Sequence, residues 1–462
     1  MKKAWELERE LRDAAVPIDR RKNSSHWYES DFSAPSGDDL IHLFWKSSVP
    51  GSLAPEIPYQ EMVQAWSNQG YDVSEAEKLI PDGIALLETG AKESLRVLTA
   101  ALLNHLKTAP KLAGHRYHVY TQYSSWEEIK SILPSDCQLL SITPWDVSFP
   151  EKIYWGWVGQ LAGGSFGTAI EGYTGAQIAK TYGEIRSYII PPETKNDDVL
   201  YELVFLDVFE KMGSEITSRE IGLEWIRQIP FGWSAEWIAL RNLSMGIFPP
   251  ESGKFLNFYS DWIGAQMRGM ICGMLAPANP LEAIRLAYID GVVSHASNGV
   301  YGEMFAAALT ALAFFVNDPR DLISKALFFI PPESEYFEKA AFVVSTLSEN
   351  QNSEIAWLKL EKHFERYNWI HAYPNLAADL FSLWYCGNDF TEAMALLAKG
   401  GNDVDCNGGL VGNILGIMNG VPPIWADPIG DLLETYIKGK ERLSIKQLAA
   451  RTADLANKTR SH

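Results

Sequence analysis

The sequence predicts an all-α fold, and three observations support this prediction. Apolar residues recur at the spacing of a helix face through most of the 462 residues. Strict alternation of apolar and polar residues, which is typical of half-buried strands, is scarce. Proline pairs at 249–250, 331–332 and 422–423 separate the helical stretches, and proline interrupts a helix because it has no backbone N–H to donate.

Residues 1–150 are expected to form a mostly helical accessory region. Apolar positions recur at helical spacing from 83 to 108, which predicts one helix that ends before Pro110. The segment from Ser124 to Glu127 has the pattern of a helix N-terminus, because a serine hydroxyl there can accept a hydrogen bond from a free N–H group. Residues 117–122 fit either a short strand or an extended linker. No catalytic pattern is recognisable in this region, so its role stays open.

The character of the sequence changes near residue 150. A segment rich in glycine and small residues runs to Gly175, and helical patterns follow it. They cover residues 198–212, 218–228, 234–245, 259–275, 280–293, 301–316, 334–348, 353–366, 374–386, 389–398, 408–418 and 444–457. We expect one domain over 151–437. Residues 438–462 carry seven basic and two acidic side chains, which favours a solvated, basic helical tail.

The charge balance restricts the classes of partner. The chain has 40 Lys and Arg against 58 Asp and Glu, so its formal net charge is 40 − 58 = −18, and its pI is about 5.0. This surplus argues against general binding to nucleic acid or to an anionic membrane surface. It leaves open a local cluster of carboxylates that holds cations.

The cysteines and the apolar runs predict a cytoplasmic protein. Cys137, Cys272, Cys386 and Cys406 are far apart and show no CxxC spacing, which favours a reducing compartment. The first residues include no apolar stretch of the kind found in secretory signals. The longest apolar run, 304–316, falls short of the roughly 20 residues needed to cross a bilayer.

Two acidic clusters each come directly before an apolar helical pattern. One is Asn196-Asp197-Asp198, and the other is the segment 402–407, which contains Asp403 and Asp405. Each cluster alone fits helix capping, because Asp and Asn suit the positive end of the helix dipole. A cap needs one carboxylate, however, and four would repel one another if the two helix starts converge. Magnesium and manganese prefer such oxygen ligands, so the pair of clusters predicts a site for divalent cations.

The glycine-rich segment 163–172 has two interpretations. Residues 163–167 match the G-x-S-x-G pattern of serine hydrolases, which requires a preceding strand that this sequence does not predict. The alternative is a tight glycine loop that presents Glu171.

Two further segments combine small residues with hydrogen-bond donors. They are 261–268 and 294–302, and they suit a ligand with phosphate or sugar groups. His295 in the second segment also fits a buried structural histidine. His115 and His118 have HxxH spacing but no third ligand nearby in the sequence, so chance is the simpler explanation.

From about 153 to 435 the chain resembles the ADP-ribosylglycohydrolase family, which includes the dinitrogenase reductase-activating glycohydrolase. Residues 163–172 resemble the family's G-D-A-L-G-A-P-x-E-G motif, and residues 196–199 resemble its T-D-D-T motif. Residues 403–406 resemble its D-T-D-T motif or the D-T-D-C-N variant. The order and separation of these motifs also match, and the resemblance covers about 60% of the chain.

The resemblance implies an all-α orthogonal multi-helix bundle with two magnesium or manganese ions. It also implies an enzyme that hydrolyses the glycosidic bond of an ADP-ribosyl group, on a protein side chain or a small molecule, and releases ADP-ribose. Glu171 falls on the family's catalytic acidic position. The metal-ligand positions are Asn196, Asp197, Asp198, Asp403, Asp405 and Cys406. The positions that line the ADP-ribose cleft are Gly264, Met267, Arg268 and His295.

The chain departs from the family pattern at several positions. Asn196 replaces a ligand threonine, and Val199 and Val404 replace two other threonines. Cys406 replaces the last ligand threonine and is a softer ligand than magnesium prefers. Gly164 stands where the family commonly has aspartate. Two alternatives therefore stay open: a degenerate protein that binds ADP-ribose or is purely structural, and a hydrolase of another nucleoside or glycoside.

Overall fold

The computed structural model describes residues 13–14, 38–141 and 144–460. It divides into two compact units, residues 1–43 and residues 44–462, and the second unit holds nearly all of the described chain. The all-α prediction is confirmed: the described residues form helices α2 to α23, with only two antiparallel pairs of two-residue strands. These pairs are β1 (Ser47–Ser48) with β2 (Pro55–Glu56), and β3 (Leu433–Glu434) with β4 (Arg442–Leu443). Within the described ranges, no helix is both long enough and apolar enough to cross a membrane.

The accessory region is helical, as predicted, but its longest predicted helix is in fact two. Its helices are α2 (Asp38–Trp45), α3 (Pro58–Asn68), α4 (Ser74–Glu88), α5 (Lys92–Thr108), α6 (Trp126–Ile132) and α7 (Asp136–Leu139). The prediction of one helix over 83–108 is wrong because the chain turns at Gly90, whose φ of +68° does not fit a right-handed helix. The predicted start of α6 is confirmed, since the Ser125 hydroxyl accepts a hydrogen bond from Glu128 N at 3.3 Å. Residues 116–118 form a 3₁₀ turn rather than a strand.

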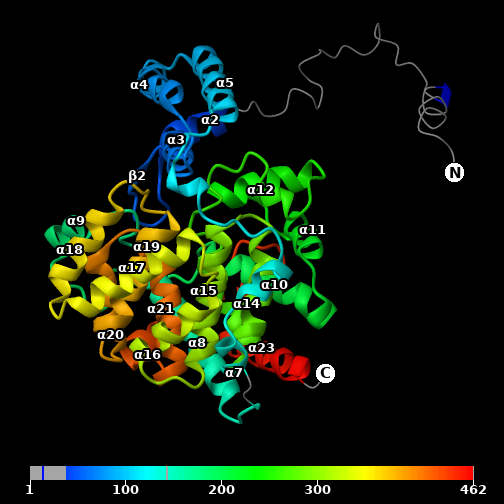
Figure 1. The fold of residues 1–462 in the computed structure, drawn as a ribbon, viewed down its shortest axis with the longest axis vertical. Helices are drawn as coiled ribbons and strands as arrows, with labels where there is room; N and C mark the ends of the chain where they lie inside the picture. The colour runs from blue at the N-terminus through cyan, green and yellow to red at the C-terminus, as the bar shows by residue number, and fades with distance from the viewer. Residues whose placement is uncertain (1–12, 15–37, 142–143, 461–462) are drawn as a thin grey trace, which may run out of the picture. The chain divides into compact units, whose positions relative to one another are not determined.

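Most of the predicted helices after residue 150 are present, and the structure adds helices at 175–182, 319–326 and 423–429 that were not predicted (Figure 1). The helices of this part of the chain are α8 (Phe149–Gly167), α9 (Gly175–Tyr182), α10 (Asp198–Met212), α11 (Ser218–Gln228), α12 (Ser234–Ser244), α13 (Met270–Leu275), α14 (Pro280–Gly291), α15 (Asn298–Ala313), α16 (Pro319–Ala326), α17 (Glu335–Glu349), α18 (Ser353–Phe364), α19 (Ala372–Tyr385), α20 (Phe390–Gly400), α21 (Val404–Asn419), α22 (Pro423–Ile429) and α23 (Ile445–Arg460).

The predicted helix over 259–275 is wrong in its first half. Only a 3₁₀ turn, Gln266–Arg268, and the short α13 are helical there. The residues before them pair with the segment that leads into α19: Trp262 forms a bridge with His371, and Ile263 N donates to Ile370 O at 2.9 Å. These long-range backbone bonds replace the local ones that a helix would need.

The prediction that the glycines of 163–167 form a loop is also wrong, because they lie inside α8. They are needed there for close packing, because the backbones of α8 and α21, which are far apart in sequence, approach each other closely. A Cβ added at Gly163 would lie 1.8 Å from Gly408 O, and one added at Gly159 would lie 2.0 Å from Gly412 O. Real Cβ atoms cannot approach so closely, so only glycine allows this contact.

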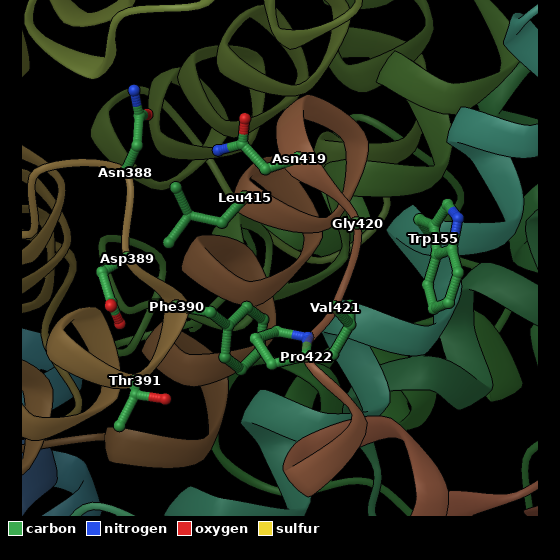
Figure 2. A pocket seen from close by; sticks show the side chains of 10 residues that line it. All are labelled: Trp155, Asn388, Asp389, Phe390, Thr391, Leu415, Asn419, Gly420, Val421 and Pro422. Atoms are coloured by element: carbon green, nitrogen blue, oxygen red, sulfur yellow. The ribbon is translucent and has the colours of Figure 1, made fainter.

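A cavity of about 520 Å³ lies at the C-terminal end of α21 (Figure 2). Leu415, Phe390 and Val421 contribute to an apolar side, and Trp155 stands across from Asn388 and Asp389. The acidic cluster that the sequence singles out is at the other end of the same helix. At about 1.5 Å per residue, the two ends are roughly 20 Å apart, so this cavity is separate from the acidic cluster.

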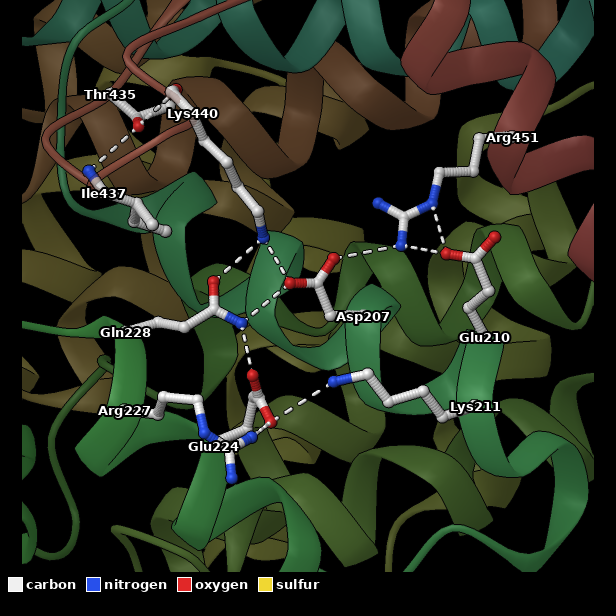
Figure 3. A network of polar contacts seen from close by, with 10 residues as sticks. All are labelled: Asp207, Glu210, Lys211, Glu224, Arg227, Gln228, Thr435, Ile437, Lys440 and Arg451. Carbon is white, nitrogen blue, oxygen red and sulfur yellow. Dashed lines mark hydrogen bonds and ion pairs between the residues drawn. The ribbon is translucent and has the colours of Figure 1, made fainter.

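The C-terminal basic segment is not a freely solvated tail, which corrects that expectation. Thr452 on α23 is fully buried and accepts a hydrogen bond from Trp157 Nε1 at 3.1 Å. Figure 3 shows Lys440 and Arg451 reaching the carboxylate of Asp207 on α10. Burial acts to raise the pKa of Asp207, but the hydrogen bonds from Lys440, Gln228 and Arg451 outweigh it, so that the pKa is lowered. These residues attach the last helix to the domain.

Glu61 on α3 is a buried acid that makes stability depend on pH. Its side chain is 7% exposed, and burial, with a smaller contribution from Glu56, raises its pKa to about 8. An exposed glutamate has a pKa near 4.3. Between about pH 4 and pH 8 the folded protein therefore keeps a proton that the unfolded chain has released. The free energy of unfolding falls as the pH rises through this window.

We predict that Glu61→Gln reduces the loss of stability at high pH, because glutamine keeps the shape without a charge. The difference between variant and wild type should grow from pH 6 to pH 9 by on the order of a few kcal/mol, since one pKa unit corresponds to about 1.4 kcal/mol. Thermal unfolding at both pH values measures it. Glu77→Gln, at an exposed position on α4, is the matched control. An equal pH response in the two variants would contradict the assignment.

Candidate functional site

Seven of the predicted site residues come together between α8, α10 and α21. Asn196, Asp197 and Asp198 lie at the start of α10, and Asp403, Asp405 and Cys406 lie at the start of α21. The ligand atoms of Asp403, Asp405 and Cys406 are all within 4.8 Å of one another. Cys406 Sγ donates to Asp198 Oδ1 at 3.5 Å and so joins the two helix starts. Glu171, in the turn after α8, is the seventh.

Helix capping does not explain these aspartates. Asp197 and Asp403 occupy the N-cap positions of α10 and α21, yet neither side chain accepts a capping hydrogen bond from the described backbone. Asp403 Oδ1 and Asn196 Oδ1 are buried and have no hydrogen-bond partner among the described residues. Buried oxygen atoms without a donor are costly. The arrangement therefore suits a positively charged group between the two helix starts.

Backbone contacts fix Glu171 against the start of α21. Gly172 N donates to Asn402 O at 2.9 Å, and Asn402 N donates to Tyr173 O at 3.1 Å. A Cβ added at Gly167 would lie 2.3 Å from Asp405 Cα, so α8 also packs directly on the acidic segment. The loop that carries Glu171 is thus held to the residues just before Asp403 by a two-way pairing.

The strand pair β1–β2 covers the outer side of this loop. Ser52 O accepts a hydrogen bond from Tyr173 Oη at 3.2 Å. A Cβ added at Gly51 would lie 2.4 Å from Thr168 Cγ2, and one added at Gly172 would lie 2.7 Å from Ala54 Cβ. Part of the accessory region therefore packs against the residues just before Glu171 and against those just after it.

The carboxylates perturb one another strongly. Burial raises the pKa of Glu171 well above its usual value, and the nearby aspartates raise it further. Burial and the charge of Asp405 raise the pKa of Asp197 to about 6. Burial likewise raises the pKa values of Asp198, Asp403 and Asp405. Five neighbouring carboxyl groups cannot all ionise in this environment without a compensating positive charge.

The predicted cleft residues are placed differently from the carboxylates. Met267 reaches the acidic cluster, with its Sδ 3.8 Å from Cys406 Sγ. Arg268 is 1% exposed and forms hydrogen bonds with Glu236 Oε1 and Ser294 Oγ, both at 2.8 Å, as well as with Asp290. Its positive charge is therefore already paired with the carboxylates of Glu236 and Asp290 inside the domain.

His295 and Gly264 belong to the same buried network as Arg268. His295 is fully buried, and its Nδ1 lies 2.7 Å from Ser294 Oγ. Burial, with the charge of Arg268, lowers the pKa of His295 well below its usual value, so the imidazole is neutral. Gly264 O accepts from Arg268 Nη1 at 2.8 Å. This geometry matches that of a buried structural histidine, and ligand contact by these residues stays a prediction.

Asn375 on α19 is a site residue that the sequence analysis missed. Its Oδ1 accepts hydrogen bonds from Asp403 N at 3.2 Å and from Asn407 Nδ2 at 2.9 Å. Its Nδ2 donates to Trp369 O and His371 O. In the sequence it is one of several polar residues of a largely apolar helix that also contains Asp379 and Ser382, and this pattern does not reveal that it supports the start of α21.

The serine-hydrolase interpretation of residues 163–167 and a metal site at His115 and His118 find no support in the geometry. Ser165 lies within α8 rather than at a strand-to-helix turn, and its hydroxyl donates to Glu193 O at 2.7 Å. His118 Nε2 lies 2.9 Å from Gly70 O, away from the acidic cluster in a different part of the fold.

The comparisons with known proteins agree with the fold. A family model described as ADP-ribosylglycohydrolase matches residues 146–462. A solved structure titled "ADP-ribosylglycohydrolase-related protein complex" is similar to the chain with a TM-score of 0.50 and 18% sequence identity, over 67% of this chain and 99% of the other. At this identity the likeness supports the fold alone. No curated protein matches.

We predict that Arg268→Met destabilises the protein by about 3–5 kcal/mol, because it leaves Asp290, Glu236 and their neighbours buried without a cation. Arg186→Ala is the matched control, since Arg186 pairs with Glu184 and Glu392 at the surface and should contribute less than about 1 kcal/mol. Unfolding in urea measures both variants. Equal midpoints for the two variants would show that the buried network does not need its arginine.

Proposed function

The chain belongs to the ADP-ribosylglycohydrolase family, and on that premise we propose that it is a hydrolase, dependent on divalent metal ions, that cleaves the glycosidic bond of an ADP-ribosyl group. The observation that carries the proposal is the cluster of Glu171, Asp197, Asp198, Asp403 and Asp405. Burial raises the pKa values within it, and the charges that raise them further come from its own members.

The chemistry of the donor set fits magnesium or manganese. Oxygen atoms predominate among the ligand positions, and these hard cations prefer oxygen. Five ionised carboxylates and two divalent ions leave a net charge of −5 + 4 = −1, which a buried site tolerates far better than −5. Asn196 Oδ1 and Asp403 Oδ1 are buried without a hydrogen-bond partner among the described residues, so both would be available for coordination. The family's usual ligand threonines are absent, and Asn196 offers an amide oxygen in one of those places.

Hydrolysis of a ribosyl bond builds positive charge on the sugar, so its transition state resembles an oxocarbenium ion. The negative cluster suits that charge. Divalent ions, when held by these carboxylates, would orient the sugar hydroxyls and lower the pKa of a water molecule. Glu171 is half-buried, next to the aspartates, and is the residue we assign as general base for the attacking water. The leaving group is a protein side chain or a small molecule.

One observation favours a second candidate, a protein that binds ADP-ribose without cleaving it. Burial, with nearby Asp198, Asp403 and Asp405, raises the pKa of the Cys406 thiol well above its usual value. A protonated thiol donates to Asp198, as its 3.5 Å contact indicates, and is a weak ligand for magnesium. Turnover decides between the two candidates.

We predict that Mg²⁺ or Mn²⁺ raises the unfolding temperature of the metal-free chain. A concentration of about 100 times the Kd stabilises the folded state by about 2.7 kcal/mol. The variant Asp403→Asn/Asp405→Asn should lose this response, as followed by calorimetry and thermal unfolding. Asp82→Asn/Asp427→Asn, with two exposed aspartates, makes the same change in net charge and should respond like the wild type. Metal binding that survives in the Asp403/Asp405 variant would overturn the assigned ligands.

We predict that the metal-supplemented protein releases ADP-ribose from one of three substrates: ADP-ribosyl-arginine, ADP-ribosyl-serine or O-acetyl-ADP-ribose. Mass spectrometry detects the product. Glu171→Gln should lower kcat by about 10²–10⁴-fold, as expected for loss of a general base, while metal binding is retained. If metal binds and none of the substrates is cleaved, the non-catalytic candidate is favoured. Unchanged turnover in Glu171→Gln would remove this residue from the mechanism.

A further inference from the structure

We propose that the accessory region forms part of the carboxylate site, and that Gln64 on α3 is a positioning residue for the start of α21. Gln64 acts there through the segment 366–371 and through Asn375. The inference rests on the proposed function, because the start of α21 carries Asp403 and Asp405, which we assign as metal ligands. Helix α3 lies outside the residues 146–462 that the family model matches, so that match assigns it no role.

The start of α21 depends on a hydrogen-bond acceptor from another helix. The first backbone N–H groups of a helix have no acceptor within the helix itself. Asn375 Oδ1 accepts from Asp403 N at 3.2 Å and from Asn407 Nδ2 at 2.9 Å. Asn375 is fully buried, so displacement of its amide would leave these donors away from water and without a partner, which is costly.

The segment 366–371 fixes the orientation of Asn375. Its Nδ2 donates to Trp369 O at 2.7 Å and to His371 O at 3.0 Å. Only the nitrogen of an amide can donate to a carbonyl, so these two bonds leave Oδ1 for the donors of α21. A shift of the segment would therefore move the amide that holds the start of α21.

Gln64 holds this segment from α3. Residues 366–370 form turns between α18 and α19 and belong to no helix or strand, so their position depends on bonds to neighbouring elements. Gln64 Nε2 donates to Arg366 O at 3.0 Å, and Gln64 Oε1 accepts from Asn368 Nδ2 at 3.3 Å. Asn368 Oδ1 in turn accepts from Ile370 N at 2.9 Å. Both ends of the Gln64 amide are thus used on the segment.

Two further residues of α3 contact the same segment. Asn68 Oδ1 accepts from Arg366 Nε at 3.3 Å. Burial raises the pKa of Glu61, and hydrogen bonds from the side chains of Asn368 and Trp369 act in the opposite direction. The contact with α3 is therefore continuous along one face of the helix.

The segment also touches the loop that carries Glu171. A Cβ added at Gly172 would lie 3.6 Å from Trp369 Cζ2, which is an ordinary van der Waals distance. The same position is 2.7 Å from Ala54 Cβ in the accessory region. Support from α3 therefore reaches both acidic parts of the site, through Asn375 to the start of α21 and through Trp369 to the loop after α8.

The variant Gln64→Ala tests the proposal. Gln64 is half-buried and alanine is a good helix former, so α3 is retained. In the metal-free chain, hydrogen exchange followed by mass spectrometry should be about 5-fold faster in the peptide that contains residues 402–407. Calorimetry should show a Kd for Mg²⁺ or Mn²⁺ raised by about 10-fold, as expected when an outer partner of metal ligands is lost. Asn368→Ala breaks the same connection and should give both changes.

Two control variants separate positioning from a general loss of stability. Gln60→Ala is at an exposed position of α3 and should change neither readout. Thr99→Val removes the buried hydrogen bond that Trp45 Nε1 donates to Thr99 Oγ1 at 2.8 Å, a bond of the accessory region that does not involve the segment 366–371. It should lower the midpoint of unfolding but change neither the exchange at 402–407 nor the Kd.

Unchanged exchange at 402–407 in both Gln64→Ala and Asn368→Ala would overturn the proposal, and so would equal changes in Thr99→Val. Faster exchange with an unchanged Kd would also overturn it, because the metal ligands would then not depend on this support. A wild-type chain that binds neither metal would contradict the proposed function instead. The exchange measurement on the metal-free chain would still decide whether Gln64 positions the start of α21.

Discussion

The rest of the site depends on the contact between α8 and α21, in which two helices touch through their backbones. Gly159 and Gly163 face Gly412 and Gly408, and any larger residue would push the helices apart. This contact brings the C-terminal end of α8 to the N-terminal end of α21. The turn that carries Glu171 therefore meets the residues just before Asp403, and the backbone bonds through Asn402 hold the two segments together.

That arrangement concentrates negative charge where the protein is least able to solvate it. Burial of neighbouring carboxylates raises their pKa values, and the fold does not relieve this by capping, since Asp197 and Asp403 make no capping bonds to the described backbone. The nearby Arg268 is occupied by Asp290 and Glu236. The domain thus keeps two kinds of buried charge apart: a network with its own cation, and a cluster of carboxylates for which we propose a cation from outside.

The sequence was sufficient for most of the helices after residue 197, because apolar periodicity reports on them directly, and the order of the motifs indicated that the acidic clusters converge. It misled at residues 163–167 and 259–265, where tertiary contact overrides local preference: glycine is a poor helix former unless a partner backbone requires it. The role of Asn375 could not be predicted, since it arises from contacts with residues far apart in the chain. The ligand roles of Arg268 and His295 stay predictions, because both residues belong to a buried hydrogen-bond network that explains their presence without a ligand.

The contact between the β1–β2 turn and the Glu171 loop has a consequence for how the chain folds. Ser52 and Tyr173 are 121 residues apart, so their pairing closes a long loop, and contacts of such high sequence separation form slowly. During synthesis the β1–β2 turn emerges well before the loop that it will cover. The Glu171 loop therefore completes its packing only when the β1–β2 turn, the loop itself and the segment around Asn402 have all been made.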